Sequence, residues 1–98
     1  MTARVAFRRA AREEFEQAAL WYERKQRGLG AQFMLEIDRA VARAAQHPDR
    51  FPIKHGVIRA VLARRFPYSV FYRSERDRIV VLAVFHVRRD PAIWRSRR

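Results

Sequence analysis

The chain has 98 residues, of which 49% are hydrophobic, and a formal net charge of +12. A chain this short folds around a single core, so we expect one domain over residues 1–98, and its hydrophobic content excludes a disordered protein. The sequence contains no cysteine, which excludes a disulfide scaffold, a thiolate nucleophile and a cysteine-based metal site, and no apolar run approaches the ~20 residues of a membrane span, so we expect a cytoplasmic protein.

The N-terminal half of the sequence predicts a short strand followed by a helical hairpin. Residues 3–8 alternate between two faces, as in a half-buried strand. Apolar residues then recur every three or four positions over residues 9–26, which is typical of an amphipathic helix. We expect Gly28 and Gly30 to end this helix in the left-handed conformation, and a second helix with the same spacing continues until the prolines of HPDRFP. Two helices joined by a short glycine turn form an antiparallel hairpin.

The C-terminal half predicts three consecutive strands and a helical turn. Residues 57–63, 68–73 and 79–86 are rich in β-branched and aromatic side chains, and the polar stretches RRFP and SERDR separate them. Asp90 and Pro91 suit the start of a short C-terminal helical turn, after which we expect the terminal RSRR to extend into solvent. The predicted fold is α+β with two layers in the order β-α-α-β-β-β: the helical hairpin packs on one face of a mainly antiparallel four-stranded sheet.

The positive charge is concentrated in the strand-rich half. Residues 1–49 carry nine basic and seven acidic side chains, whereas residues 50–98 carry thirteen and three. Such an asymmetry attracts an anion, either a nucleic acid or an acidic protein surface, and we expect the arginines of the strands to share one outward surface. Arginine accounts for twenty of the 22 basic residues, which suits two-pronged contacts to phosphate or carboxylate, although a biased genome composition would have the same effect.

The polar side chains are compatible with few kinds of catalytic site. The histidines have no metal-site spacing, no phosphate-binding loop occurs, and we expect neither a metal nor another cofactor. The three glutamates of residues 13–16 are interpreted as the solvated face of the first helix. His86 closes the last predicted strand, where a lone histidine is most often packed or hydrogen-bonded. Beside Arg88 and Arg89 it could instead serve as acid or base in metal-free RNA cleavage.

Two tyrosines leave a similar choice open. Tyr68 and Tyr72 share one face of a predicted strand. They form either a core-facing row beneath the helices, with the arginines on the solvent face, or a stacking surface for bases that the arginines flank.

Several short motifs occur in an order that resembles the RelE/ParE toxin superfamily. They are WYE at residues 21–23, GLGAQF, HPDRFP, RRFPYSVFYR and VLAVFHVRRDPAIWRSR, and together they extend over nearly the whole chain. The resemblance implies the toxin of a type II toxin–antitoxin pair, a group that includes plasmid stabilisation proteins. It also implies a cognate antitoxin with an acidic segment that folds on binding. We expect the antitoxin to contact Trp21, Tyr22, Tyr72 and Trp94.

The superfamily contains two activities, and the resemblance favours one of them. RelE-like members cut mRNA on the ribosome, and ParE-like members inhibit DNA gyrase. The nucleases carry basic residues where this chain has Ala60, Leu62 and Ser69, none of which can neutralise a phosphate. We therefore expect a ParE-like gyrase inhibitor. The alternatives are a RelE-like mRNA endonuclease, with His86 and Arg89 as its catalytic residues, and a non-toxic module that binds nucleic acid or antitoxin.

The arginines of the C-terminal half are the candidates for contact with the target. Arg89 matches the C-terminal arginine of the nucleases, and Arg95 falls near their terminal tyrosine. The residues expected to bind the target or a phosphate are Arg59, Arg64, Arg65, Arg73, Arg88, Arg89 and Arg95.

Overall fold

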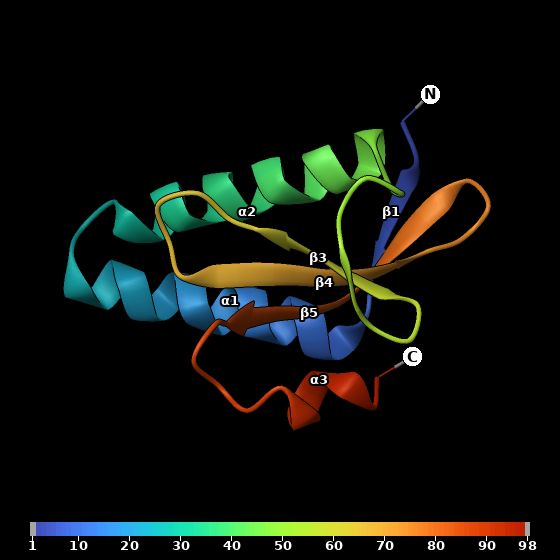
Figure 1. The fold of residues 1–98 in the computed structure, drawn as a ribbon. Helices are drawn as coiled ribbons and strands as arrows, with labels where there is room; N and C mark the ends of the chain where they lie inside the picture. Colours follow the sequence, from blue (N-terminus) through green and yellow to red (C-terminus); the bar gives the residue numbers. More distant parts are fainter. Residues whose placement is uncertain (1, 98) are drawn as a thin grey trace.

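The computed structural model describes residues 2–97 and consists of a helical layer over a sheet (Figure 1). In chain order the elements are β1 (Arg4–Phe7), α1 (Arg9–Lys25), α2 (Leu29–Gln46), β2 (Ile53–His55), β3 (Ile58–Leu62), β4 (Tyr68–Ser74), β5 (Arg78–His86) and α3 (Ala92–Arg95). None of the helices within residues 2–97 combines the length and the apolar composition of a membrane span.

The sheet has the strand order β1-β5-β4-β3-β2. The strands β2 to β5 form an antiparallel meander, and β1 lies parallel to β5, with Arg4 opposite Arg78 and Phe7 opposite Val81. The α+β class and the mainly antiparallel sheet are thereby confirmed. The expected number of four strands is wrong, because β2 adds a fifth strand among the described residues. Its three residues are all exposed and pair irregularly with β3, so they have no alternating pattern that the sequence could reveal.

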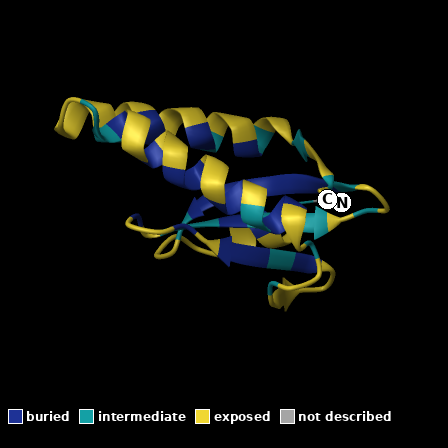
Figure 2. Ribbon diagram, turned by 90° about the horizontal axis from the view of Figure 1, so that it is seen from above, coloured by how far each residue is buried: buried dark blue, intermediate teal, exposed yellow. Residues whose placement is uncertain are grey.

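The main core lies between the helices and one face of the sheet, as predicted. Phe15 of α1 and Phe33 of α2 pack against residues of β4 and β5 in this core, which includes Val70 and Tyr72. Figure 2 shows the buried positions gathered where the helices meet the sheet. A smaller core occupies the opposite sheet face, where the Trp94 ring of α3 stacks on Phe71 with 3.9 Å between centroids.

A close approach of the two helices depends on the glycine turn. Gly28 has φ +86°, in the left-handed region, and precedes α2. Gly30 has a different role from the one expected, because it lies inside α2 at a helix contact: a Cβ there would come within 2.5 Å of the Ala19 carbonyl oxygen. The carboxylate of Glu23 accepts hydrogen bonds from the backbone N–H groups of Gly28 and Gly30, which stabilises the start of α2.

The C-terminal part of β5 has an open edge. β1 ends at Phe7, opposite Val81, before the chain turns into α1. The register of β4 and β5 shifts at the same place, because Leu82 is inserted as a β-bulge between two paired residues. From Leu82 to His86, β5 pairs with β4 on one side, and no strand within residues 2–97 pairs with it on the other. Helix α1 packs beside this edge.

Candidate functional site

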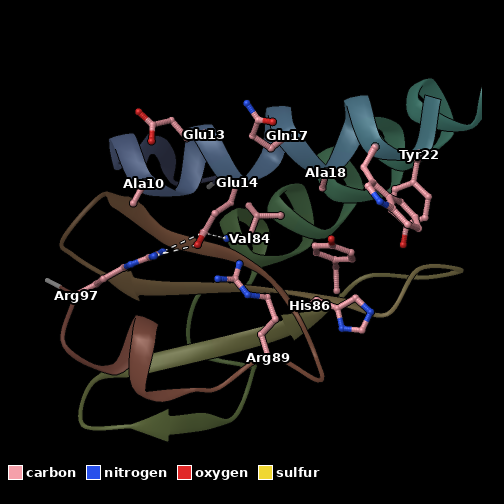
Figure 3. A pocket seen from close by; sticks show the side chains of 12 residues that line it. Ala10, Glu13, Glu14, Gln17, Ala18, Tyr22, Val84, His86, Arg89 and Arg97 are labelled. Atoms are coloured by element: carbon pink, nitrogen blue, oxygen red, sulfur yellow. Dashed lines mark hydrogen bonds and ion pairs between the residues drawn. The ribbon is translucent and has the colours of Figure 1, made fainter. Parts of the chain in front are cut away.

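A groove of about 700 Å³ runs between α1 and the open edge of β5. Figure 3 shows side chains of α1 on one side of it, and Val84, His86 and Arg89 on the other. Trp21, Tyr22 and Tyr68 supply aromatic surface to the same groove. An apolar groove beside unpaired strand backbone is suited to an extended peptide, because such a peptide gains both side-chain contacts and backbone hydrogen bonds.

Glu14 and Arg97 close one part of this edge with their side chains. The Glu14 carboxylate accepts a hydrogen bond from the Val84 backbone N–H at 3.1 Å, and two from the Arg97 guanidinium at 2.9 and 3.0 Å. Figure 3 shows the contacts among Glu14, Val84 and Arg97. Arg97 also donates to the carbonyl oxygen of Leu82 at 3.1 Å. The two side chains thus occupy backbone groups that a neighbouring strand would otherwise use.

This contact corrects two expectations. Glu14 is not part of the solvated helix face, unlike Glu13 and Glu16, which are exposed. The terminal RSRR does not simply extend into solvent either, since Arg97 returns to the sheet; Arg98 lies outside the described residues. Sequence reasoning missed both residues because their sequence separation is 83 positions, and no local pattern pairs a helix carboxylate with a terminal arginine.

His86 is both packed and hydrogen-bonded. Its ring lies edge-on to Tyr68, with 5.3 Å between centroids, and its Nδ1 accepts a hydrogen bond from the Arg88 backbone N–H at 3.0 Å. The neutral ring therefore carries its proton on Nε2. Burial raises the pKa of the neighbouring Tyr68 hydroxyl, Tyr22 and Glu14 raise it further, and Arg89 opposes them. Tyr68 consequently remains a neutral hydrogen-bond donor at physiological pH.

A second hollow, of about 280 Å³, lies on the sheet face that carries α3. His86 and Arg89 line this outer pocket as well as the groove, so the two expected catalytic residues do lie together. Ala60 and Ser69 also line the outer pocket, as does Arg95. Leu62, the third residue at a nuclease position, is 60% exposed and does not line it.

Among residues 2–97, no single pocket is lined by all seven expected target-binding arginines. Arg59 donates to the carbonyl oxygens of Asp49 and Phe51, and thereby holds the segment before β2. Hydrogen bonds from Arg78 and then Arg73 lower the pKa of Glu75, so Arg73 is already paired with a carboxylate.

The remaining arginines divide between a turn and the end of β5. The turn after β3 exposes Arg64 and Arg65, and Arg65 donates to Gln32 at 3.0 Å with a left-handed backbone (φ 69°). Arg88 is exposed beside His86. The guanidinium of Arg89 lies 4.5 Å from the Phe85 ring centre, and that of Arg95 lies 5.8 Å from Trp94. Of the seven, the structure therefore brings only Arg89 and Arg95 together at a pocket.

The four aromatic residues expected to contact an antitoxin fall into two pairs. Trp21 is 51% exposed, and together with Tyr22 it lines the groove. Tyr72 is 0% exposed and Trp94 is 4% exposed, because they belong to the inner and outer cores respectively. Tyr72 donates its hydroxyl to the Pro48 carbonyl oxygen at 2.7 Å. Tyr68 and Tyr72 thus form the core-facing row, and a partner cannot contact the Tyr72 ring without opening the core.

The site is built for binding through aromatic surface, backbone and guanidinium groups. Among residues 2–97, no group of three or more His, Cys, Asp or Glu side chains is arranged to hold a metal ion. Residues that sequence reasoning missed here are Glu14, Arg97 and Lys54, the last of which lines the outer pocket from β2.

Comparison with known proteins identifies a family from the sequence and a similar fold among solved structures. The family "ParE toxin of type II toxin-antitoxin system, parDE" matches residues 5–91. A solved structure, "Chromosomal ParDE TA system from P. aeruginosa", has a similar fold with a TM-score of 0.73 and 17% sequence identity, over 87% of this chain and 96% of that chain. No curated protein matches significantly. Because the family match extends over most of the sequence, the chain belongs to the ParE toxin family of type II toxin–antitoxin systems.

Proposed function

We propose that this ParE-family protein is a toxin that inhibits DNA gyrase by binding it, and that a cognate antitoxin neutralises it. The observation that carries the proposal is the family match over residues 5–91. The proposed activity requires a rigid binding surface and no chemical step, which fits a small domain whose outer pocket and groove both lie at the end of one strand.

The composition of the outer pocket supports binding over RNA cleavage. Metal-free cleavage needs fixed positive charge around the phosphate that is attacked. Two of the three positions where the related nucleases are basic, Ala60 and Ser69, line this pocket and bring no charge to it. In addition, the Nδ1 atom of His86 is already an acceptor in its own turn, so only the opposite nitrogen is left for proton transfer.

One observation favours the endonuclease as the second candidate. His86 and Arg89 line the same pocket, and Arg95 and Lys54 add positive charge to its rim. A histidine beside guanidinium groups could transfer a proton and stabilise a phosphorane-like charge if RNA entered this pocket.

The groove supports the neutralisation half of the proposal. Trp21 and Tyr22 offer aromatic surface there, and the part of the β5 edge that Glu14 and Arg97 do not occupy offers backbone for an added strand. The positive net charge would accelerate encounter with an acidic antitoxin segment, while burial of apolar side chains would supply most of the affinity. We expect the association rate to fall as salt concentration rises.

Expression of the toxin without antitoxin tests the proposal. In cells, gyrase inhibition should produce DNA breaks and filamentation, whereas an endonuclease should stop translation and leave codon-positioned cuts in mRNA. His86→Ala should abolish toxicity if the protein is a nuclease, because the proton transfer is lost. If gyrase is the target, the variant should weaken toxicity at most and leave DNA breaks and filamentation detectable, because His86 then only lines the binding pocket. Arg76→Ala, an exposed arginine that lines neither hollow, is the control for expression and charge. Codon-positioned cuts without DNA breaks would overturn the proposal.

A further inference from the structure

The outer pocket lies over small side chains of the sheet face that carries α3. On this face Leu62, Ser69 and Phe85 form one cross-strand row, and Ala60 and Phe71 form part of the next. In these rows Ala60 lies opposite Phe71 and Ser69 lies opposite Phe85, and all four residues line the outer pocket. The hollow that these residues line has a volume of about 280 Å³, at the small end of ligand pockets.

The positive charge at this pocket has no carboxylate partner within residues 2–97. Lys54, Arg89 and Arg95 line it, and no aspartate or glutamate among the described residues does. The guanidinium groups of Arg89 and Arg95 lie over aromatic rings, and neither donates to a carboxylate within residues 2–97. The contrast with Arg73 and Arg97 is direct, because these two already pair with Glu75 and Glu14.

The pocket also contains an unused polar group. In the part of the chain that the structure describes, the Ser69 hydroxyl has no hydrogen-bond partner, and it can donate to an anion at the base of the hollow. A ligand that enters would therefore meet cations at the rim and a hydroxyl at the base. Between them, the walls are apolar and consist of Phe71, Phe85, Trp94 and Pro91.

We propose that the outer pocket binds a glutamate side chain of the toxin's protein target. A glutamate has an apolar stem of two methylenes that fits between the aromatic walls, and a planar carboxylate that guanidinium groups bind in two-pronged fashion. A phosphodiester lacks such a stem, and the pocket lacks cations at Ala60 and Ser69, the positions beneath it. This inference rests on the proposed function in one respect, since the glutamate belongs to a protein target.

The proposal is tested by titration of the isotope-labelled full chain with N-acetyl-glutamate N-methylamide, followed by NMR. We expect saturable shifts of the Ala60 and Ser69 amides and of the Arg89 and Arg95 Nε–H groups. The neutral isostere, N-acetyl-glutamine N-methylamide, should bind about tenfold more weakly because it cannot form charge-assisted hydrogen bonds. Inorganic phosphate and a ribodinucleotide are titrated under the same conditions as the competing ligand classes.

Two variants and a matched control complete the test. Ser69→Leu fills the hollow and removes the hydroxyl, and Arg95→Gln removes one exposed rim charge without touching the core; each should weaken glutamate binding about tenfold. Arg76→Gln removes the same charge away from the pocket and should leave the affinity unchanged. The spectrum of each unliganded variant reports whether it folds.

Three outcomes would overturn the proposal. They are equal binding of the glutamate and glutamine probes, saturation by phosphate or dinucleotide at lower concentration than by glutamate, and an equal loss of affinity in Arg76→Gln. Gyrase inhibition is measured separately on the same samples. If the protein inhibits gyrase but does not discriminate glutamate from glutamine, the proposed function stands and the glutamate site is refuted. The failure of one proposal is therefore distinguishable from the failure of the other.

Discussion

Replacement of Arg97 by alanine tests whether the closure of the β5 edge stabilises the fold. The substitution removes three hydrogen bonds, two to the Glu14 carboxylate and one to the Leu82 carbonyl oxygen. It also leaves Glu14, whose side chain is only 15% exposed, without a cation. The Arg97 side chain would then no longer tie the chain after α3 to β5.

The magnitude follows from the burial of the pair. Breaking a fully buried ion pair costs roughly 3–5 kcal/mol, and breaking an exposed one costs about 0–1 kcal/mol. Arg97 is 20% exposed, and its release returns side-chain entropy, so we expect a loss of about 2 kcal/mol in the free energy of unfolding. For a domain of this size the melting temperature should fall by about 10 °C.

The assay is urea unfolding followed by circular dichroism, with Arg97→Ala, Glu14→Ala and the double variant forming a mutant cycle. The coupling energy should reach about 1 kcal/mol or more, since the two side chains are in direct contact. Arg95→Ala is the control, because the Arg95 side chain is exposed and forms no ion pair or hydrogen bond with another side chain within residues 2–97; its guanidinium lies 5.8 Å from the Trp94 ring centre. Two results would show that Glu14 and Arg97 do not jointly stabilise the β5 edge. One is a loss of unfolding free energy in Arg97→Ala no larger than in Arg95→Ala, and the other is a double variant whose loss equals the sum of the two single losses.

Three further predictions concern the core, the helix contact and the groove. Burial raises the pKa of Tyr72 from its ordinary 10.0 to about 12, so its neutral form stabilises the fold fully below pH ~10 and this stabilisation is lost as the pH rises toward 12. Between pH 10 and 12 the free energy of unfolding should therefore fall by roughly 2–3 kcal/mol less in Tyr72→Phe than in the unmodified protein. Urea titration at each pH measures the two free energies. Gly30→Ala should lose about 1–3 kcal/mol in the same assay despite the better helix propensity of alanine, because its Cβ would meet the Ala19 carbonyl oxygen; an unchanged midpoint would contradict this helix contact. Trp21→Ala should weaken antitoxin binding by about tenfold or more in calorimetry with Leu20→Ala as the exposed apolar control, and equal effects of the two would argue against the groove.

Sequence periodicity predicted the layers of this fold because they depend on local repeats. The spacing of apolar residues in α1 and α2 and the β-prone runs of β3, β4 and β5 each reflect one buried face, and all five elements are present. The parallel pairing of β1 with β5 and the three-residue β2 could not be read in this way. Both depend on contacts with distant segments, and β2 has no buried residue.

Only the part of the site that depends on local structure was predicted from the sequence. His86 and Arg89 are three positions apart at the end of a strand, so their proximity follows from local structure. Exposure was harder to predict than position. Tyr72 and Trp94 were expected to contact the antitoxin, but they are core residues on the two faces of the sheet. The arginine count indicated a basic protein, while intramolecular contacts that bind Arg59 and Arg73 could not be seen without the fold.

The most direct measurement places purified toxin in two assays side by side: supercoiling of relaxed plasmid by DNA gyrase, and cleavage of mRNA on programmed ribosomes. We expect the toxin to inhibit supercoiling, its antitoxin to restore supercoiling, and the mRNA to remain intact. Cleavage of mRNA by the toxin, with gyrase fully active at the same concentration, would contradict it.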